Sequence, residues 1–172
     1  MSDFQIDGNI LILNAENETF RFCSMGYIEP LKTEDGLIVV DKPQRRYRNL
    51  KGLDYNKHCD ADTEFTEFKV EGLPTSKGVY VWLIDNEKEL SYIGEGVNLR
   101  KRFSSTGYGK ISPRNCFVGG QSTNCKMNHE VLEKWNEGKC FHLYILETER
   151  HKDIEKKLIM KYHPELNIKN NC

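Results

Sequence analysis

Long apolar runs are absent from this 172-residue sequence, and their absence excludes one large class of proteins. No stretch approaches the roughly 20 apolar residues that a membrane-spanning helix requires. The N-terminal MSDFQIDGNI also lacks the pattern of a signal peptide. With 38% hydrophobic and 30% charged residues, the composition is typical of a soluble globular protein. We therefore expect a cytoplasmic protein that does not bind a membrane.

Closely spaced cysteine pairs are also missing. None of the six cysteines belongs to a C-x-x-C motif, and the closest two, Cys116 and Cys125, are too far apart for a usual zinc knuckle. Without an export signal, the cysteines are expected to be reduced thiols rather than a disulfide framework. The pattern therefore does not favour a structural zinc site.

A third absence is local: residues 97–126 contain no acidic side chain, although the net charge of the chain is only −1. This span carries the basic residues Arg100, Lys101, Arg102, Lys110, Arg114 and Lys126. A second basic segment, KPQRRYRNLK at 42–51, includes Arg45 and Arg46, whereas residues 1–41 carry eight acidic and two basic side chains. Because a solvated face usually mixes both signs, this segregation favours a polyanionic partner over an ordinary basic surface.

The apolar pattern predicts an α+β fold in two parts, residues 1–72 and residues 73–172. The first part is expected to form short strands at 10–13, 19–23 and 36–40. The second part is expected to form strands at 78–84, 90–94 and 140–146 and helices at 97–104, 123–137 and 150–162. We therefore predict a small three-stranded antiparallel sheet flanked by helices, preceded by a β-rich N-terminal extension.

The stretch GVYVWLIDNEKELSYIG, residues 78–94, predicts a β-hairpin that carries two tyrosines. A five-residue turn would place Trp82 opposite Tyr92. Tyr80 would then lie opposite Gly94, where the absence of a side chain leaves space, and both tyrosines would share one face. A turn one residue shorter would send the tyrosines to opposite faces.

A carboxylate interrupts the apolar face of the last expected helix. This face is formed by Ile154, Leu158, Ile159 and Tyr162, and Glu155 lies within it. A carboxylate at such a position is costly unless it is paired or binds a metal ion. Glu155 is therefore either a helix-edge partner of Arg or Lys, or a metal ligand. Mg²⁺ often takes one protein carboxylate together with water and phosphate oxygens.

Together these motifs resemble the GIY-YIG nuclease family. GVY at 78–80 and YIG at 92–94 are similar to the two elements that name the family. GEGVNLRKRF places Arg102 ten residues after Tyr92, where the family has its arginine. IEKKLIMKYHPELN at 154–167 resembles the family's closing pattern of Glu, Leu-Ile, Pro and Asn. The resemblance covers residues 77–168, and the order of its pieces makes it specific.

The resemblance implies an endonuclease that hydrolyses DNA phosphodiester bonds with a single divalent ion, Mg²⁺ or Mn²⁺. Tyr80 would be the general base, and Tyr92 would position the attacking water and the scissile phosphate. Arg102 would bind the phosphate, Glu155 would hold the metal ion, and Asn167 would support the site. Because a phenol has an ordinary pKa of about 10, nearby cations are needed to make it an effective base.

The chain departs from the family at Thr106, where many members have a histidine. Tyr108, His129 or His163 could take that role. Residues 108–129 form an insertion relative to the smallest members, and its GGQSTN segment precedes a helix whose N-terminus can attract an anion.

The cations of this insertion, Lys110, Arg114 and Lys126, are expected to contact DNA phosphates. Arg100, Lys101 and the arm that carries Arg45 and Arg46 would add further backbone contacts. The alternatives are an N-capped flexible loop for the insertion and a solvated linker for the arm.

The main alternative function is a nucleic-acid-binding module that has this fold without activity. The complete set of Tyr80, Tyr92, Arg102 and Glu155 argues against it. A third hypothesis is that residues 1–72 direct a protein–protein interaction that delivers the nuclease. Restriction, mobile-element and phage-related roles are all compatible. The sequence specifies neither the cleavage site, nor DNA over RNA, nor nicking over double-strand cutting, nor the oligomeric state.

Overall fold

The computed structural model describes residues 3–47 and 52–168, and the chain forms two compact units. The first, the sheet unit, comprises Met1–Tyr27, Val70–Arg100 and Cys140–Cys172. The second, the loop unit, comprises Ile28–Lys69 and Lys101–Lys139. Each unit combines segments that are far apart in the sequence. The division of function between residues 1–72 and 73–172 stays a prediction.

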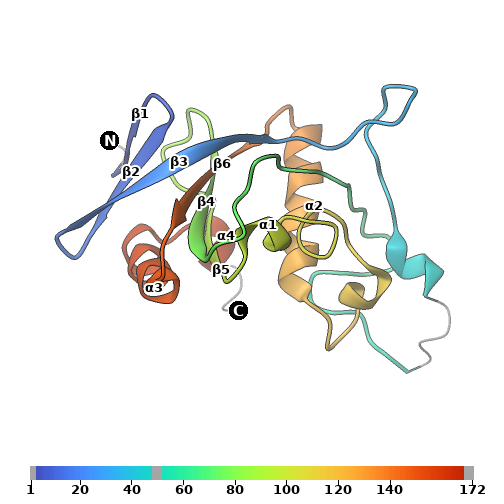
Figure 1. Ribbon diagram of the computed structural model, residues 1–172. Coiled ribbons are helices and arrows are strands. Elements are labelled where there is room, and N and C mark those ends of the chain that lie inside the picture. The colour runs from blue at the N-terminus through green and yellow to red at the C-terminus, as the bar shows by residue number, and fades with distance from the viewer. Residues whose placement is uncertain (1–2, 48–51, 169–172) are drawn as a thin grey trace. The chain divides into compact units, whose positions relative to one another are not determined.

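The sheet unit is built on six strands in the order β1-β2-β3-β6-β4-β5 (Figure 1). They are β1 (Gln5–Asp7), β2 (Ile10–Ala15), β3 (Glu18–Ile28), β4 (Gly78–Ile84), β5 (Tyr92–Gly96) and β6 (Phe141–Glu147). The pairs β1–β2, β2–β3, β4–β5 and β4–β6 are antiparallel. The prediction of a small three-stranded sheet with a separate N-terminal extension is therefore wrong. β3 pairs with β6, whose edge would otherwise expose unpaired N–H and C=O groups.

The β4–β5 hairpin has the register that the five-residue turn predicts. Trp82 pairs with Tyr92, and Tyr80 pairs with Gly94. Since side chains alternate along a strand, this register confirms that both tyrosines lie on one face of the sheet. Every residue of β4 is buried, as expected for a strand that has neighbours on both edges.

α3 (His151–Tyr162) packs on β2, β4 and β5 and completes the core of the sheet unit (Figure 1). Its Ile154 and Leu158 belong to one cluster with strand side chains such as Leu13, Phe22 and Val81. Each fully buried side chain of this kind contributes about 1.5–3 kcal/mol relative to exposure. The predicted helix at 150–162 and its apolar face are confirmed.

The other helices are α1 (Leu99–Arg102), α2 (Ser122–Asn136), α4 (Glu165–Ile168) and the 3₁₀ helices η1 (Pro43–Arg46) and η2 (Pro113–Cys116). α2 confirms the predicted helix at 123–137, whereas α1 is shorter than the predicted 97–104. α1 ends at Arg102 because the chain turns back: the Tyr108 N–H donates to the Arg102 carbonyl at 2.9 Å. Within the described ranges, no helix is both long and apolar enough to cross a membrane.

In the loop unit, side chains that bond to the backbone replace much of the regular structure. Asn128 on α2 is fully buried and accepts the Thr66 N–H at 2.9 Å. Its amide donates to the Thr66 carbonyl at 2.9 Å and to the Tyr108 carbonyl at 2.8 Å. The Gln44 amide likewise donates to two carbonyls of the 60–63 turn. Single polar residues therefore hold this unit's long connections.

The predicted strand at 36–40 is wrong. In the described part of the loop unit, this segment forms an isolated bridge between Lys32 and Ile38 rather than a strand. Leu37 and Val40 are 68% and 45% exposed, so this apolar run is only partly covered. Without a neighbouring sheet or core, β-branched residues alone do not establish a strand.

Candidate functional site

The two hairpin tyrosines lie in a buried aromatic row of the sheet unit. The ring centroids of Tyr80 and Tyr92 are 6.3 Å apart, and Trp82 meets Tyr92 edge-on at 6.2 Å. Phe141 extends the row, 5.2 Å from Trp82. Tyr80 is 0% exposed and Tyr92 is 6% exposed. Tilted and edge-on contacts are favourable and restrict ring orientation, so the row holds both phenols on a rigid support.

Gly94 is the residue that accommodates the Tyr80 ring. A Cβ built on Gly94 would lie 2.5 Å from both the Cζ and the hydroxyl oxygen of Tyr80. Carbon atoms in contact are normally about 3.5–4.0 Å apart. The space that the sequence predicts opposite Tyr80 is therefore present, and the phenol itself fills it.

Asn167 on α4 holds the strand that carries Tyr92. Its side-chain oxygen accepts the Ile93 N–H, and its amide donates to the Ile93 carbonyl, both at 2.8 Å. Ile93 lies between Tyr92 and Gly94, so the pair of bonds acts directly on the YIG backbone. This contact ties α4 to the hairpin, and the supporting role of Asn167 at the site stays a prediction.

Glu155 lies half-buried on α3, directly after the buried Ile154. One turn earlier, His151 is 6% exposed, and its Nδ1 pairs with a carboxylate oxygen of Glu95 in β5. This pair was not predicted, because its two residues lie 56 positions apart and no local pattern links them.

A single-ion site at Glu155 stays a prediction, and no closed metal centre is found in the described part of the chain. In residues 3–47 and 52–168, no group of three or more His, Cys, Asp or Glu side chains is arranged to hold a metal ion. Mg²⁺ does not need such a group, since it commonly retains water and takes phosphate oxygens beside one or two carboxylates. Glu155, a half-buried carboxylate, fits that requirement.

Arg102 and Tyr108 form a pair of their own in the loop unit. The guanidinium carbon of Arg102 lies 4.6 Å from the centroid of the Tyr108 ring, within the range of a cation–π contact. Tyr108 is 0% exposed, and its ring meets Phe103 at 5.3 Å. Tyr108 thus orients Arg102. The other predicted catalytic residues belong to the sheet unit, and the convergence of the two groups stays a prediction.

Arg45 and Arg46, two predicted DNA-contacting cations of η1, already pair with carboxylates. Arg45 lies 2.8 Å from Asp62, and Arg46 lies 2.6 Å from Asp41. The hydrogen bond from Arg46 lowers the pKa of the Asp41 carboxyl. These exposed pairs are worth little, about 0–1 kcal/mol each, so a phosphate could displace them.

The remaining predicted cations differ in exposure. Arg100 and Lys101 are exposed on α1, although the Arg100 Nε also donates to a backbone carbonyl at 2.8 Å. Lys110 pairs with a carboxylate of the loop unit at 3.4 Å, and Arg114 donates to a carbonyl at 3.0 Å. Lys126 is only 6% exposed. The exposed side chains need the least rearrangement to reach a phosphate.

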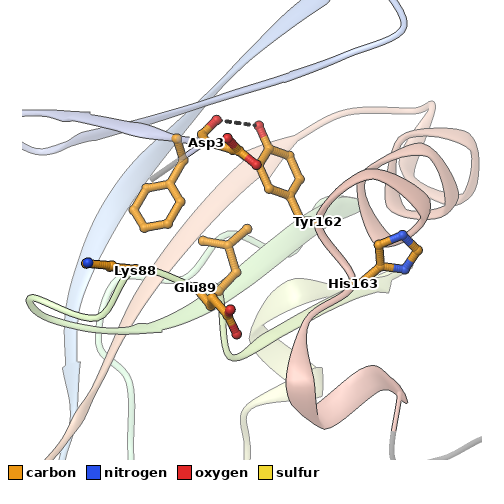
Figure 2. A pocket seen from close by; sticks show the side chains of 7 residues that line it. Asp3, Lys88, Glu89, Tyr162 and His163 are labelled. Atoms are coloured by element: carbon orange, nitrogen blue, oxygen red, sulfur yellow. Dashed lines mark hydrogen bonds between the residues drawn. The ribbon is translucent and has the colours of Figure 1, made fainter. Parts of the chain in front are cut away.

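A pocket of about 350 Å³ in the sheet unit is lined by Asp3, Phe4, Lys88, Glu89, Leu90, Tyr162 and His163 (Figure 2). The Tyr162 hydroxyl donates to the Asp3 carbonyl at 3.2 Å. The lining mixes both signs of charge and includes none of the predicted catalytic residues. His163, one of the alternatives for the missing family histidine, is exposed here. Another alternative, His129, bonds through Nδ1 to the Glu64 carbonyl at 2.7 Å.

Tyr80, Tyr92 and Asn167 thus gather around β5, and Glu155 lies on the helix that packs against that strand. In the loop unit, Arg102 is paired with a buried phenol. No family model matches the chain, and the searches of curated proteins and of solved structures found no match. The functional inference therefore rests on the residues and contacts above.

Proposed function

We propose that this protein is a metal-dependent endonuclease that hydrolyses DNA phosphodiester bonds. The observation that carries the proposal is the hairpin register, which pairs Tyr80 with Gly94 and leaves Tyr92 on the same face. The likeness of residues 77–168 to GIY-YIG nucleases supplies the proposed roles of these phenols, Arg102 and Glu155.

A phosphodiester resists attack because it is anionic, so positive charge near the phosphate is the first requirement. In the proposal, the Arg102 guanidinium binds the phosphate and offsets the charge that develops on it. Water oriented by Tyr92 attacks the phosphorus and gives its proton to the ionised Tyr80 oxygen, while the P–O3′ bond breaks and the departing oxygen takes a proton from solvent. A Mg²⁺ or Mn²⁺ ion held by Glu155 would supply further positive charge at the phosphate.

DNA is the proposed partner because the loop unit contains the acid-free span 101–126. Cations in such a span neutralise phosphates irrespective of base sequence. Cleavage is expected to leave 5′-phosphate and 3′-hydroxyl ends, as the resemblance implies. A cytoplasmic location is part of the proposal and is supported by the free thiols of Cys23, Cys59, Cys116, Cys125 and Cys140.

A catalytically silent DNA-binding module is the second candidate. It is favoured by the burial of Tyr80 and Tyr108, both 0% exposed, because fully buried phenols also serve as core residues. This candidate predicts DNA binding that is unchanged by loss of the Tyr80 hydroxyl and no cleavage with any divalent ion.

The test is incubation of the full chain with supercoiled plasmid and Mg²⁺ or Mn²⁺. We expect cleavage that disappears in Tyr80→Phe and in Glu155→Ala. Tyr55→Phe and Glu165→Ala, which change a tyrosine and a glutamate at exposed positions, are the matched controls. Equal cleavage by the wild type and both site variants would contradict the assignment, and binding without cleavage would favour the silent module.

A further inference from the structure

A second polar cluster of the sheet unit connects β3, β6 and the β4–β5 turn. Ser24 Oγ lies 2.6 Å from His142 Nε2. On the other side of the imidazole, His142 Nδ1 lies 3.3 Å from Asp85 Oδ1. The three side chains form a hydroxyl–imidazole–carboxylate chain, which is the order of contacts that activates a serine nucleophile. None of them has a role in the proposed nuclease reaction.

The partners of His142 select the tautomer that a nucleophilic serine requires. An ionised Asp85 can only accept a hydrogen bond, so the proton of a neutral His142 belongs on Nδ1. The Tyr144 hydroxyl, 3.2 Å from the same nitrogen, can also accept that proton. Nε2 then carries no proton and accepts a hydrogen bond from the Ser24 hydroxyl. His142 is therefore oriented as a general base.

Two tyrosines hold the base and the carboxylate in place. The ring centroids of Tyr27 and Tyr144 lie 4.5 Å and 4.2 Å from that of His142. The Tyr27 hydroxyl donates to Asp85 Oδ2, and this bond raises the pKa of Tyr27 to about 12. The His142 side chain is 14% exposed, so these contacts restrict a base that is largely removed from solvent.

The backbone beside Ser24 is open and carries a hydrogen-bond donor. The Gly26 N–H donates to Ser24 Oγ at 3.2 Å. Gly26 has a φ of +85°, a conformation that favours glycine, and a Cβ built there would meet nothing within 4 Å. Ser24 is itself half-buried, so part of its side chain is open to a small ligand. This N–H is engaged by the Ser24 hydroxyl itself rather than aimed at an oxyanion, so we limit the proposed substrates to esters with good leaving groups.

We propose that Ser24, His142 and Asp85 form an acyl-transfer site for small activated esters. Ser24 Oγ attacks the acyl carbon while His142 Nε2 takes the hydroxyl proton. The bond to the leaving group then breaks, and that proton passes to the departing oxygen. Water next attacks the acyl-serine, His142 receives its proton and returns it to Ser24 Oγ, and a carboxylic acid is released.

The probe is p-nitrophenyl acetate, incubated with the full chain. We expect release of p-nitrophenol and, in peptides mapped by mass spectrometry, an acetyl group on Ser24. Ser24→Ala should abolish this labelling, and His142→Gln should slow it by about 100-fold, the usual contribution of a general base. Asp85→Asn should also slow it strongly, by up to about 10⁴-fold, because an amide can donate to Nδ1 and leave the proton of His142 on Nε2.

Ser76→Ala is the matched control, since Ser76 donates to the carboxylate of Glu147 at 2.6 Å but has no histidine partner in that contact. It should leave the rate unchanged. Acetylation confined to lysines in the wild type would overturn the proposal, as would equal rates in the wild type and a folded Ser24→Ala. The peptide map that locates the acetyl group is made on the wild-type chain, so this result does not depend on whether any variant folds. DNA cleavage is scored separately, so failure of one proposal leaves the other standing.

Discussion

The sheet unit and the loop unit obtain their stability by different means. In the sheet unit, strands and α3 share one apolar cluster, so many side chains contribute to the same core. The loop unit has a smaller apolar cluster, which includes Phe65, Ile111 and Phe117. Its amide side chains such as Asn128, Gln44 and Asn56 bond to distant backbone groups. A distributed core tolerates single changes better than a connection that depends on one residue. We therefore expect the two units to respond differently to substitution.

The proposed chemistry is divided in the same way. The sheet unit contributes the phenols, Glu155 and Asn167, all on regular elements. The loop unit contributes Arg102 and the acid-free basic span. Rigid elements suit groups that must act on one atom, whereas contacts with the DNA backbone tolerate looser geometry.

Asn128→Ala should give the largest effect on stability and should break the loop unit first. It leaves three buried backbone groups without their partner, at a cost of about 3 kcal/mol or more. Urea denaturation measures the loss in unfolding free energy, and hydrogen exchange along α2 shows whether the loop unit opens first. Asn136→Ala, an exposed asparagine on the same helix, is the control. Equal small losses in both variants would mean that the amide bonds do not hold this unit.

Gly94→Ala should be the next largest change and tests the tight packing of the sheet unit. The added methyl collides with the Tyr80 ring, and overpacking of this kind costs about 1–3 kcal/mol. Combination with Tyr80→Leu, which removes the ring, should recover part of the loss. Simple additivity of the two effects would contradict direct contact as the cause.

Asn167→Ala should loosen one edge of the sheet without unfolding it. Loss of both bonds to Ile93 is expected to cost about 1–2 kcal/mol and to speed hydrogen exchange at the Ile93 amide. Glu165→Ala, an exposed change on the same short helix, should leave that amide protected. Unchanged hydrogen exchange at the Ile93 amide in Asn167→Ala would show that Asn167 does not position this strand.

The smallest expected effect is the pH dependence of an exposed ion pair in the sheet unit. Hydrogen bonds from Arg150 and then Lys157 lower the pKa of Glu18 from 4.5 to about 2. A carboxylate with a lowered pKa stabilises the fold above its unfolded value of 4.5, and this contribution is lost as pH falls toward 2. Urea midpoints should therefore fall less steeply over this window in Glu18→Gln. An identical slope would show that the pair contributes nothing.

Local patterns were sufficient to predict several elements of the sheet unit. The continuous apolar run GVYVWLI and the apolar face of residues 150–162 are properties of short segments, and the structure confirms both. The extent of the sheet could not be predicted, because the β3–β6 pairing joins segments more than a hundred residues apart. The local pattern of apolar residues does not indicate which distant strand a segment pairs with. The 36–40 run has strand-like composition but forms only an isolated bridge, which the composition does not reveal.

The candidate sites show the same limit. A five-residue turn predicted the pairing partners in the hairpin. Side-chain alternation then placed both tyrosines on one face. The contacts between His151 and Glu95, and between Ser24 and His142, join residues 56 and 118 positions apart, so they depend on topology. A single Ser or His carries no signal of such a partner in the sequence.

The central claim is that Tyr80 and Glu155 act on the same phosphodiester. The most direct test is the single-turnover rate of plasmid cleavage with Mg²⁺ for the wild type, Tyr80→Phe, Glu155→Gln and the double variant. Residues that serve one step lose activity non-additively, so each single change should slow cleavage about 100-fold or more and the double change little further. Undiminished cleavage in either single variant, or no cleavage by the wild type, would contradict the claim.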